Sequence, residues 1–178
     1  SINPAPFAAF IALPEVTIVS SSPERFLSVD RNGVIESRPI KGTRRRGSSQ
    51  EEDALLAKEL DRSVKDRAEN LMIVDLVRND LGRICETGSG EVPELMAIEP
   101  YASVFQMVST VRGKLRSDCG VDDLLRATFP PGSMTGAPKI AAMQLIDRIE
   151  PVRRGIYSGA IGYFDAAGGL DLSVVIRT

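Results

Sequence analysis

Residues 25–39, RFLSVDRNGVIESRP, predict an antiparallel β hairpin from which the rest of the fold can be worked out. Two strand-forming segments, 25–29 and 34–39, flank the Asp30–Gly33 tetrapeptide. The Asn32-Gly33 step supplies the positive φ angles of a tight turn, and this dipeptide between two strands is a strong hairpin signal. Pro39 cannot donate to a β ladder, so the second strand should be interrupted there or lie at an edge.

Strands and helices follow in blocks on both sides of this hairpin. Ser48 and Ser49 stand at capping-box spacing before Glu51 and Glu52, and Ser63 can cap a second helix that runs to about Leu81. The remaining segments are the apolar runs 7–13 and 16–19, β-like segments 95–98 and 104–111, a short helix 121–129, a Pro/Gly loop 130–138, a long helix 140–149, and a second hairpin formed by 157–164 and 170–176. Blocks rather than strict alternation favour an α+β fold.

Composition narrows the class of protein. The 178 residues are 43% hydrophobic, enough for a sizeable core, and their formal net charge of -2 excludes the strongly basic footprint of a general nucleic-acid binder. No apolar run approaches the roughly 20 residues of a membrane helix, and there is no signal-peptide pattern. Two cysteines are no disulfide framework and indicate a reducing cytoplasm. Since the chain contains no histidine, its chemistry must use carboxylates, lysines, hydroxyls and backbone.

The first candidate site follows the hairpin, where Lys41 stands beside Gly42 and Thr43. Gly42 permits close backbone approach and Thr43 offers a hydroxyl, so Lys41 could clamp a substrate or, if burial kept it neutral, act as a nucleophile. Spacing alone favours an exposed turn lysine. The three arginines at 44–46 are interpreted as a solvated stretch rather than an RNA patch, because no aromatic residue interleaves them.

The second candidate is the segment 131–139, which precedes a helix. Small residues, hydroxyls and a helix N-terminus can bind an anion, because unpaired N–H groups and the helix dipole point toward the ligand. The segment lacks the Gly-Lys-Ser/Thr ending of a P-loop. A plain loop is an equally good interpretation.

Two carboxylates on the second helix are unusual. Glu69 has Met72, Ile73 and Leu76 as its i+3, i+4 and i+7 neighbours, so it should lie on an apolar face, and Asp75 shares that situation. A buried carboxylate needs a cation, a metal or hydrogen-bond donors. A salt bridge to Arg78 or Arg67 is slightly favoured; the alternative is an oxygen-bound Mg²⁺ completed by water and substrate.

Other polar groups are weaker candidates by themselves. Glu24 precedes the hairpin at a turn, where it could be a general acid or an ordinary surface residue. Arg177, with Ser173 on one face of the last strand, could bind a carboxylate bidentately or pair with Asp171. The Tyr157–Ala160 stretch adds a phenol, a hydroxyl and a glycine that permits a ligand near the backbone.

Taken together, these motifs resemble those of the chorismate-utilising enzymes from end to end. The matching stretches are 22–27, 38–43, 69–83, 130–139, 157–163 and 176–178. The family fold is a large α+β sandwich in which two sheets face each other with helices outside. Since the chain begins at Ser1 and stops within a predicted strand, residues 1–178 are expected to be an internal piece of the catalytic domain, lacking its N-terminal half and C-terminal end and inactive alone.

The resemblance also implies a reaction. Family members that form aminodeoxychorismate carry Pro-Ile-Lys-Gly-Thr, as here, whereas those that form anthranilate, isochorismate or salicylate typically carry alanine in place of Lys41. Lys41 would add to C2 of chorismate and expel the C4 hydroxyl, and ammonia from a glutamine amidotransferase subunit would then add at C4. The product, 4-amino-4-deoxychorismate, leads to p-aminobenzoate and folate.

The other implied roles are assigned by position. Glu24 resembles the general acid, and Glu69 resembles a ligand of the Mg²⁺ that holds the ring carboxylate. Substrate-binding groups are implied at Gly42, Thr43, Thr135, Tyr157, Gly159 and Arg177. One departure is that Phe105 and Gln106 occupy the stretch in which many members have a histidine close to the substrate.

Two alternatives remain at this stage. In the first, the protein is an anthranilate synthase component I in which Lys41 is a neutral substitution. In the second, it is a non-catalytic module that binds an anion or a nucleotide through 131–139, or RNA through 44–46. The second alternative explains neither Glu24 nor Glu69 nor Arg177.

Overall fold

The computed structural model describes residues 5–178, so Ser1, on which the expectation about the start of the chain rests, lies outside the described residues. Strands β3 (Arg25–Val29), β4 (Val34–Ser37), β5 (Ile40–Arg45), β6 (Glu91–Pro100), β7 (Val104–Lys114), β8 (Ala160–Phe164) and β9 (Leu170–Val174) form one antiparallel sheet. Hydrogen bonds connect the strands along the path β5-β7-β4-β3-β9-β8. Strands β5 and β4 pair with successive parts of one edge of β7, and β6 pairs with its other edge. Strands β1 (Phe7–Ala12) and β2 (Thr17–Ser22) form a separate hairpin.

The predicted central hairpin is confirmed, with one correction in its turn. Strands β3 and β4 pair antiparallel, and Asp30 closes the turn because its carboxylate accepts the backbone N–H groups of Asn32 and Val34. Only Gly33 of the Asn-Gly step has a positive φ, at 75°. Pro39 interrupts the chain between β4 and β5, as the sequence predicts. Both strands then pair with the same edge of the long strand β7.

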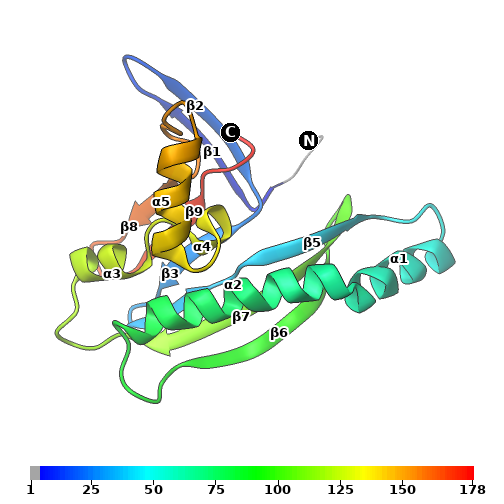
Figure 1. The fold of residues 1–178 in the computed structure, drawn as a ribbon, viewed down its shortest axis with the longest axis horizontal. Coiled ribbons are helices and arrows are strands. Elements are labelled where there is room, and N and C mark those ends of the chain that lie inside the picture. Colours follow the sequence, from blue (N-terminus) through cyan, green and yellow to red (C-terminus); the bar gives the residue numbers. More distant parts are fainter. Residues whose placement is uncertain (1–4) are drawn as a thin grey trace.

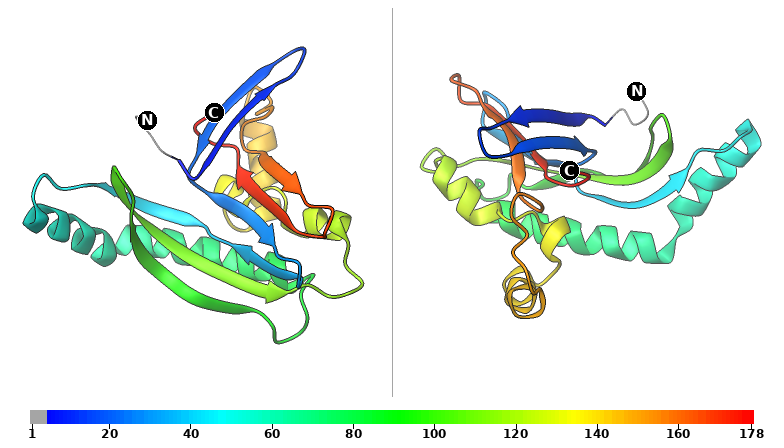
Figure 2. Two further views of the ribbon diagram at one scale, coloured as in Figure 1. Left: turned by 180° about the vertical axis from the view of Figure 1, so that it is seen from behind. Right: turned by 90° about the horizontal axis from the view of Figure 1, so that it is seen from above.

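Two long helices cover one face of this sheet (Figures 1 and 2). Helix α1 (Gln50–Arg62) begins at Ser49 and α2 (Val64–Gly82) at Ser63, and each serine side chain accepts a hydrogen bond from a first-turn backbone N–H. These are the predicted caps. Helix α2 packs Ile73, Val74 and Val77 onto the sheet. This buried contact fixes the helix across β5 and β7.

The C-terminal part of the chain carries three shorter helices: α3 (Val121–Thr128), α4 (Gly132–Thr135) and α5 (Lys139–Ile149). The segment 130–138 is therefore not wholly a loop, because α4 forms one short helical turn within it. Strand β9 ends at Val174, so Arg177 does not belong to a strand face shared with Ser173, contrary to the sequence prediction. In residues 5–178 no helix is both long and apolar enough to cross a membrane.

Candidate functional site

Glu24 lies in the short link between β2 and β3, and it is buried rather than at the surface. Only 6% of it is exposed, which contradicts the interpretation as a surface turn residue. Its carbonyl oxygen accepts a hydrogen bond from the Val174 N–H of β9 at 3.0 Å, and its own N–H donates to Ser22 Oγ at 3.3 Å. The backbone is thereby held on both sides while the side chain points into the interior.

Burial raises the pKa of the Glu24 carboxyl to about 7. Three neighbours oppose this effect and lower the pKa: the Ser133 hydroxyl, the charge of Lys41 and the backbone at Ile40. The net result is a carboxyl whose protonated form is well populated at neutral pH. A carboxylic acid in that state can donate a proton to a leaving group.

Lys41 approaches the same place from β5. It is half-buried, and its Nζ donates a hydrogen bond to the carbonyl oxygen of Ser133 at 3.4 Å. The exposed-lysine interpretation is therefore wrong. Three segments meet here: the start of β3, the start of β5 and helix α4. The amine, the acid and the α4 backbone form the central group of the candidate site.

Ser133 is the site residue that the sequence analysis did not single out. Its Oγ is buried without a hydrogen-bond partner in the described part of the chain, although it lies close enough to Glu24 to lower the pKa of that carboxyl. We interpret this as proximity without good hydrogen-bond geometry. The available signal was that 131–139 contains two hydroxyl residues, Ser133 and Thr135, which the sequence alone does not distinguish.

A small cavity lies beside Glu24 and Ser133, and Lys41 is not among the residues that line it. Glu24, Ser133 and Asp80 contribute polar atoms to its lining, and its apolar lining includes Ile73, Val77 and Val174. Its volume is about 20 Å³, enough for a group the size of a water molecule. The cavity can thus hold a molecule the size of water and not a six-membered ring.

Lys139 does not serve the anion site suggested for 131–139. Its Nζ donates to Asp80 Oδ2 at 2.6 Å and to the carbonyl oxygens of Thr128 and Pro130 at 2.6 and 2.8 Å. All three ammonium hydrogens are used, so this lysine joins α2 to the end of α3 and the start of the 131–139 segment. The hydroxyl of Thr135 likewise bonds locally, to the carbonyl oxygens of Gly132 and Gly136.

Glu69 does not occupy the apolar face that the sequence predicts. Its side chain is 43% exposed and pairs with Lys65 at 3.7 Å, while Asp75 is exposed and pairs with Arg78. The buried stripe of α2 instead runs through Asn70, Ile73 and Val77. Glu69 lies one helical turn after Asp66, which abuts Gly42, and one turn before Ile73, which lines the cavity.

Glu69, the expected metal ligand, has no further acidic side chains grouped with it as a metal cluster in residues 5–178. Residues 5–178 contain no group of three or more acidic or cysteine side chains that could hold an ion. An accessible carboxylate could serve Mg²⁺ as one ligand, because this ion usually keeps several waters and takes one or two protein carboxylates. Glu69 by itself does not make a complete metal site in the described part of the chain.

Gly42 and Thr43 have different surroundings from those expected. A Cβ at Gly42 would lie 2.8 Å from Asp66 Cβ and 2.9 Å from Leu60 Cδ1, and its φ is 87°. Gly42 therefore lets helices α1 and α2 pack close to the backbone of β5, rather than making room for a ligand. Thr43 is exposed and lies opposite Gln106 of β7. Gln106, in the stretch where the resemblance implies a histidine, is only 2% exposed.

The remaining predicted residues lie outside the group around Glu24. Thr135, Tyr157 and Gly159 line a separate, wide groove beside α5. Arg177 is exposed beyond β9, and Asp171, its expected structural partner, binds Arg25 instead. Each of the three arginines at 44–46 pairs with a carboxylate: Arg44 with Glu59 and Asp66, Arg45 with Glu52, and Arg46 with Asp53. Arg44 and Arg46 are half-buried and Arg45 is exposed, so the predicted solvated stretch is confirmed only at Arg45.

Comparison with known proteins identifies relatives over the whole chain. Residues 1–178 match a family model described as chorismate binding enzyme. The aminodeoxychorismate synthase of Streptomyces pristinaespiralis is 56% identical over 178 residues, 100% of this chain and 25% of that protein. Aminodeoxychorismate synthase component 1 of Escherichia coli is 52% identical over 176 residues, 99% of this chain and 39% of that protein.

Solved structures agree with the fold. A crystal structure of anthranilate synthase component I from Streptococcus pneumoniae superimposes with a TM-score of 0.88 at 41% identity, and the match covers 99% of this chain and 38% of that one. The predicted α+β class, with the present chain as part of a larger fold, is therefore confirmed. The chain spans between a quarter and two fifths of the length of these three proteins.

Proposed function

Because this chain belongs to the chorismate binding enzyme family, we propose that it is part of an aminodeoxychorismate synthase, which replaces the C4 hydroxyl of chorismate by an amino group. We propose further that residues 1–178 are one portion of a catalytic domain that continues on both sides. Relatives named aminodeoxychorismate synthase, 52–58% identical to this chain, support the proposal. The activity then belongs to the longer protein.

One observation carries the choice of reaction: the Lys41 amine lies in the same group as the buried acid Glu24. Lys41 Nζ contacts the carbonyl oxygen of Ser133, and its positive charge lowers the pKa of the Glu24 carboxyl. A nucleophile and a protonated acid in one small site can attack a ring and protonate its leaving group. An alanine at position 41 would leave only the acid.

In the proposed reaction the Lys41 ammonium first gives a proton to the ionised Glu24 carboxylate, and the free amine then forms a bond from Nζ to C2 of chorismate. The two ring double bonds shift, the C4–O bond breaks, and the hydroxyl leaves as water with the Glu24 proton. Ammonia then forms a bond to C4, the ring double bonds shift back and the C2–Nζ bond breaks, which frees the Lys41 amine. The new C4 ammonium loses one proton to the Glu24 carboxylate, which restores the acid. Overall one ammonia enters and one water leaves, with no oxidation. The water-sized cavity between Glu24 and Ser133 can receive either small molecule.

The remaining residues are proposed to bind substrate. Thr43, Thr135, Tyr157 and Arg177, with the backbone at Gly42 and Gly159, would contact the anionic substrate, and Ser133 joins this set because its hydroxyl is unpaired. Glu69 would supply one ligand to Mg²⁺, which when bound neutralises a substrate carboxylate. The other ligands would come from residues beyond this chain.

We propose a glutamine amidotransferase as the source of ammonia. The relatives named component 1 imply a second component, and this chain has no histidine to pair with a cysteine for glutamine hydrolysis. Cys85 and Cys119 are free thiols, as expected in a reducing compartment, and we propose the cytoplasm.

A product assay tests the function. The full-length protein that contains this chain would receive chorismate, Mg²⁺ and an ammonium salt, and the products would be separated and identified by mass. Aminodeoxychorismate without anthranilate supports the proposal. Anthranilate would keep the family and overturn the role of Lys41, in line with the similarity to anthranilate synthase component I. Omitting Mg²⁺ should stop product formation.

A further inference from the structure

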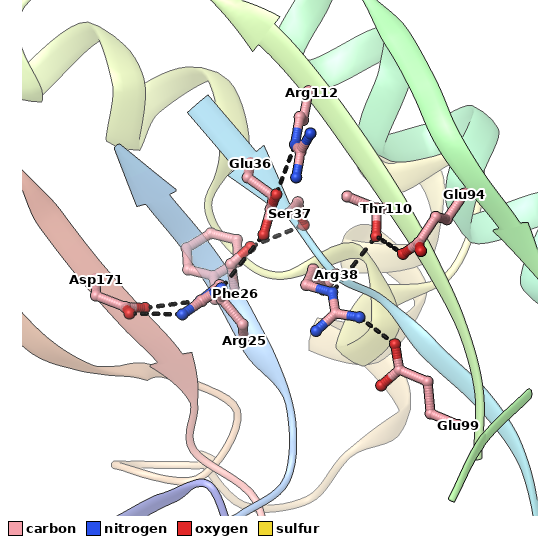
Figure 3. Close-up of polar contacts among 10 residues, drawn as sticks. All are labelled: Arg25, Phe26, Glu36, Ser37, Arg38, Glu94, Glu99, Thr110, Arg112 and Asp171. Atoms are coloured by element: carbon pink, nitrogen blue, oxygen red, sulfur yellow. Dashed lines mark hydrogen bonds and ion pairs between the residues drawn. The ribbon is translucent and has the colours of Figure 1, made fainter. Parts of the chain in front are cut away.

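Arg25, the residue after Glu24, ties three strands of the sheet together (Figure 3). Its Nε and Nη2 donate to the two carboxylate oxygens of Asp171 on β9, at 3.1 and 2.9 Å, and its Nη1 donates to Glu36 Oε1 on β4 at 3.3 Å. The side chains are largely shielded from solvent, with 28%, 22% and 16% exposed for Arg25, Asp171 and Glu36. Such a two-point bond to a carboxylate fixes orientation as well as distance.

This clamp lies where the backbone ladder is irregular. The pairing of β3 with β9 shifts register between Arg25 and Leu27. Immediately before the shift, a single backbone hydrogen bond joins Glu24 to β9, from Val174 N–H to the Glu24 carbonyl oxygen. A register shift loosens the pairing of adjacent residues, because one residue is left out of the ladder. The side-chain bonds of Arg25 add a restraint here to the two bonds that hold the Glu24 backbone, with Val174 and with Ser22 Oγ.

We propose that Arg25 is a positioning residue that holds Glu24 in its buried place beside Lys41 by clamping the first residue of β3 to β9 and β4. The inference rests on the proposed role of Glu24 as general acid and deepens it. The Arg25 guanidinium bonds to Asp171 and Glu36, while the Glu24 carboxyl lies in the cavity near Ser133. Arg25 thus acts on Glu24 through the backbone.

Removing Arg25 has two possible effects on Glu24, and they differ in sign. If the clamp is lost, the link 22–25 loosens, water reaches the carboxyl, and its pKa falls toward the ordinary value. If only charge matters, the loss of a cation and the release of Asp171 raise that pKa. The other charged groups facing Glu24 are Lys41 from β5, and Asp80 from α2, which is paired with Lys139 of α5. The substitution at Arg25 leaves these charged groups in place, whichever of the two effects dominates.

The matched control is Arg112. It pairs with the same Glu36, through Nε to Oε2 at 2.7 Å, but lies on β7 and does not contact β3 in these bonds. Arg112→Met therefore removes one charge from the same network without releasing Glu24. Arg25→Lys keeps the charge of Arg25 but cannot bond to Asp171 and Glu36 in the same forked way.

The experiment follows the Glu24 carboxyl by carbon-13 NMR in the full-length protein, with Glu24→Gln to assign the signal. Arg25→Met should lower its pKa by one unit or more, Arg25→Lys by less, and Arg112→Met by no measurable amount. An unchanged or raised pKa in Arg25→Met would overturn the proposal. If Arg25→Met does not fold, Arg25→Lys, which keeps the charge and loses the forked bonds, must still lower the pKa; no change there overturns the proposal equally.

This measurement is independent of turnover. A wild-type protein that makes no aminodeoxychorismate, but whose Glu24 titration responds to Arg25, refutes the proposed function and keeps the clamp. A protein that makes the product with an unresponsive Glu24 refutes the clamp alone. In an active protein, Arg25→Met should also lower kcat at least tenfold and move the alkaline limb of the rate profile to lower pH. Arg112→Met should leave that limb in place.

Discussion

Lys41 Nζ reaches the carbonyl oxygen of Ser133 across 3.4 Å, although the two residues are 92 positions apart in the chain. Ser133 in turn places its hydroxyl near Glu24. One residue of α4 thus brings the amine and the acid of the proposed reaction together. A contact of 3.4 Å is at the long end for a hydrogen bond, so the amine is located but not tightly held. It remains available for attack on a substrate.

Lys41→Ala in the full-length protein should abolish aminodeoxychorismate formation, because no other amine lies beside Glu24 in the contacts described. With wild-type protein and chorismate but no ammonia, mass spectrometry should detect an adduct on Lys41 with the mass of chorismate less one water. Lys58→Ala, an exposed lysine on α1, is the control and should keep full activity. Undiminished product from Lys41→Ala would refute the covalent role.

The Glu24 carboxyl should give the rate profile an alkaline limb near pH 7. The acid works only in its protonated form, and burial raises its pKa to about 7, so kcat/KM should fall as pH rises through that value. Glu24→Gln should lose at least 10²-fold in rate, as is typical for a positioned general acid. A wild-type profile that stays flat from pH 6 to 9 would exclude this role.

The same carboxyl should make folding stability depend on pH. Its pKa is higher in the folded protein, about 7, than the ordinary value of 4.5, so the folded state binds the proton more tightly. Stability is therefore lost as pH rises from 4.5 through 7, by about 3 kcal/mol at most. Denaturant unfolding at pH 5 and 8 should show this loss in the wild type and a smaller one in Glu24→Gln. Equal losses in the two proteins would contradict it.

The secondary structure was predictable because its signals are local. Ser49 and Ser63 cap their helices within three residues, and Asp30 and Gly33 close a turn inside a single hairpin. The burial of Glu24 was not predictable in this way. It depends on segments more than one hundred residues further along the chain, around Ser133 and Val174. The residues around Pro23 carry no sequence signal that these distant segments will bury Glu24.

Glu69 shows how a helical pattern can mislead. Helix α2 buries the polar Asn70 and Asp80 and leaves Leu71 and Met72 more than 40% exposed, so counting apolar neighbours selects the wrong face. Asn70 is buried because its amide bonds Ser109 Oγ and the Met107 carbonyl oxygen on β7, and Asp80 because it bonds Lys139. Hydrogen bonds to residues far away in the sequence allow these two polar side chains to be buried. The pattern offered a metal at Glu69 only as the alternative to a salt bridge, and the family resemblance then favoured the metal.

Gly42→Ala should destabilise the protein more than Gly33→Ala. Both glycines have positive φ, 87° and 75°, a conformation that costs an alanine roughly 1–2 kcal/mol. At Gly33 the nearest atom to an added Cβ is the flexible end of Lys114 at 3.6 Å, whereas at Gly42 it is Asp66 Cβ at 2.8 Å. Overpacking against α1 and α2 adds roughly 1–3 kcal/mol. Heat or urea unfolding of both variants measures the difference, and equal losses would refute the close packing.

Lys139→Met should be among the most destabilising substitutions at a charged residue. Its Nζ bonds Asp80 and two carbonyl oxygens, and the side chains of the pair are only 12% and 10% exposed. Burial already raises the pKa of Asp80 despite the opposing charge of Lys139. Without that charge the carboxylate is uncompensated, and breaking such a pair costs about 3–5 kcal/mol.

The matched control is Arg126→Met, which breaks the exposed pair with Asp122 at 3.8 Å. An exposed i,i+4 pair contributes about 0.3–0.5 kcal/mol, so this variant should unfold almost as the wild type does. The loss in Lys139→Met should shrink as pH falls and Asp80 becomes protonated, while that in Arg126→Met should stay small throughout. If both variants unfold alike at pH 7, Lys139 is not the link that holds α2 to the segment carrying Ser133.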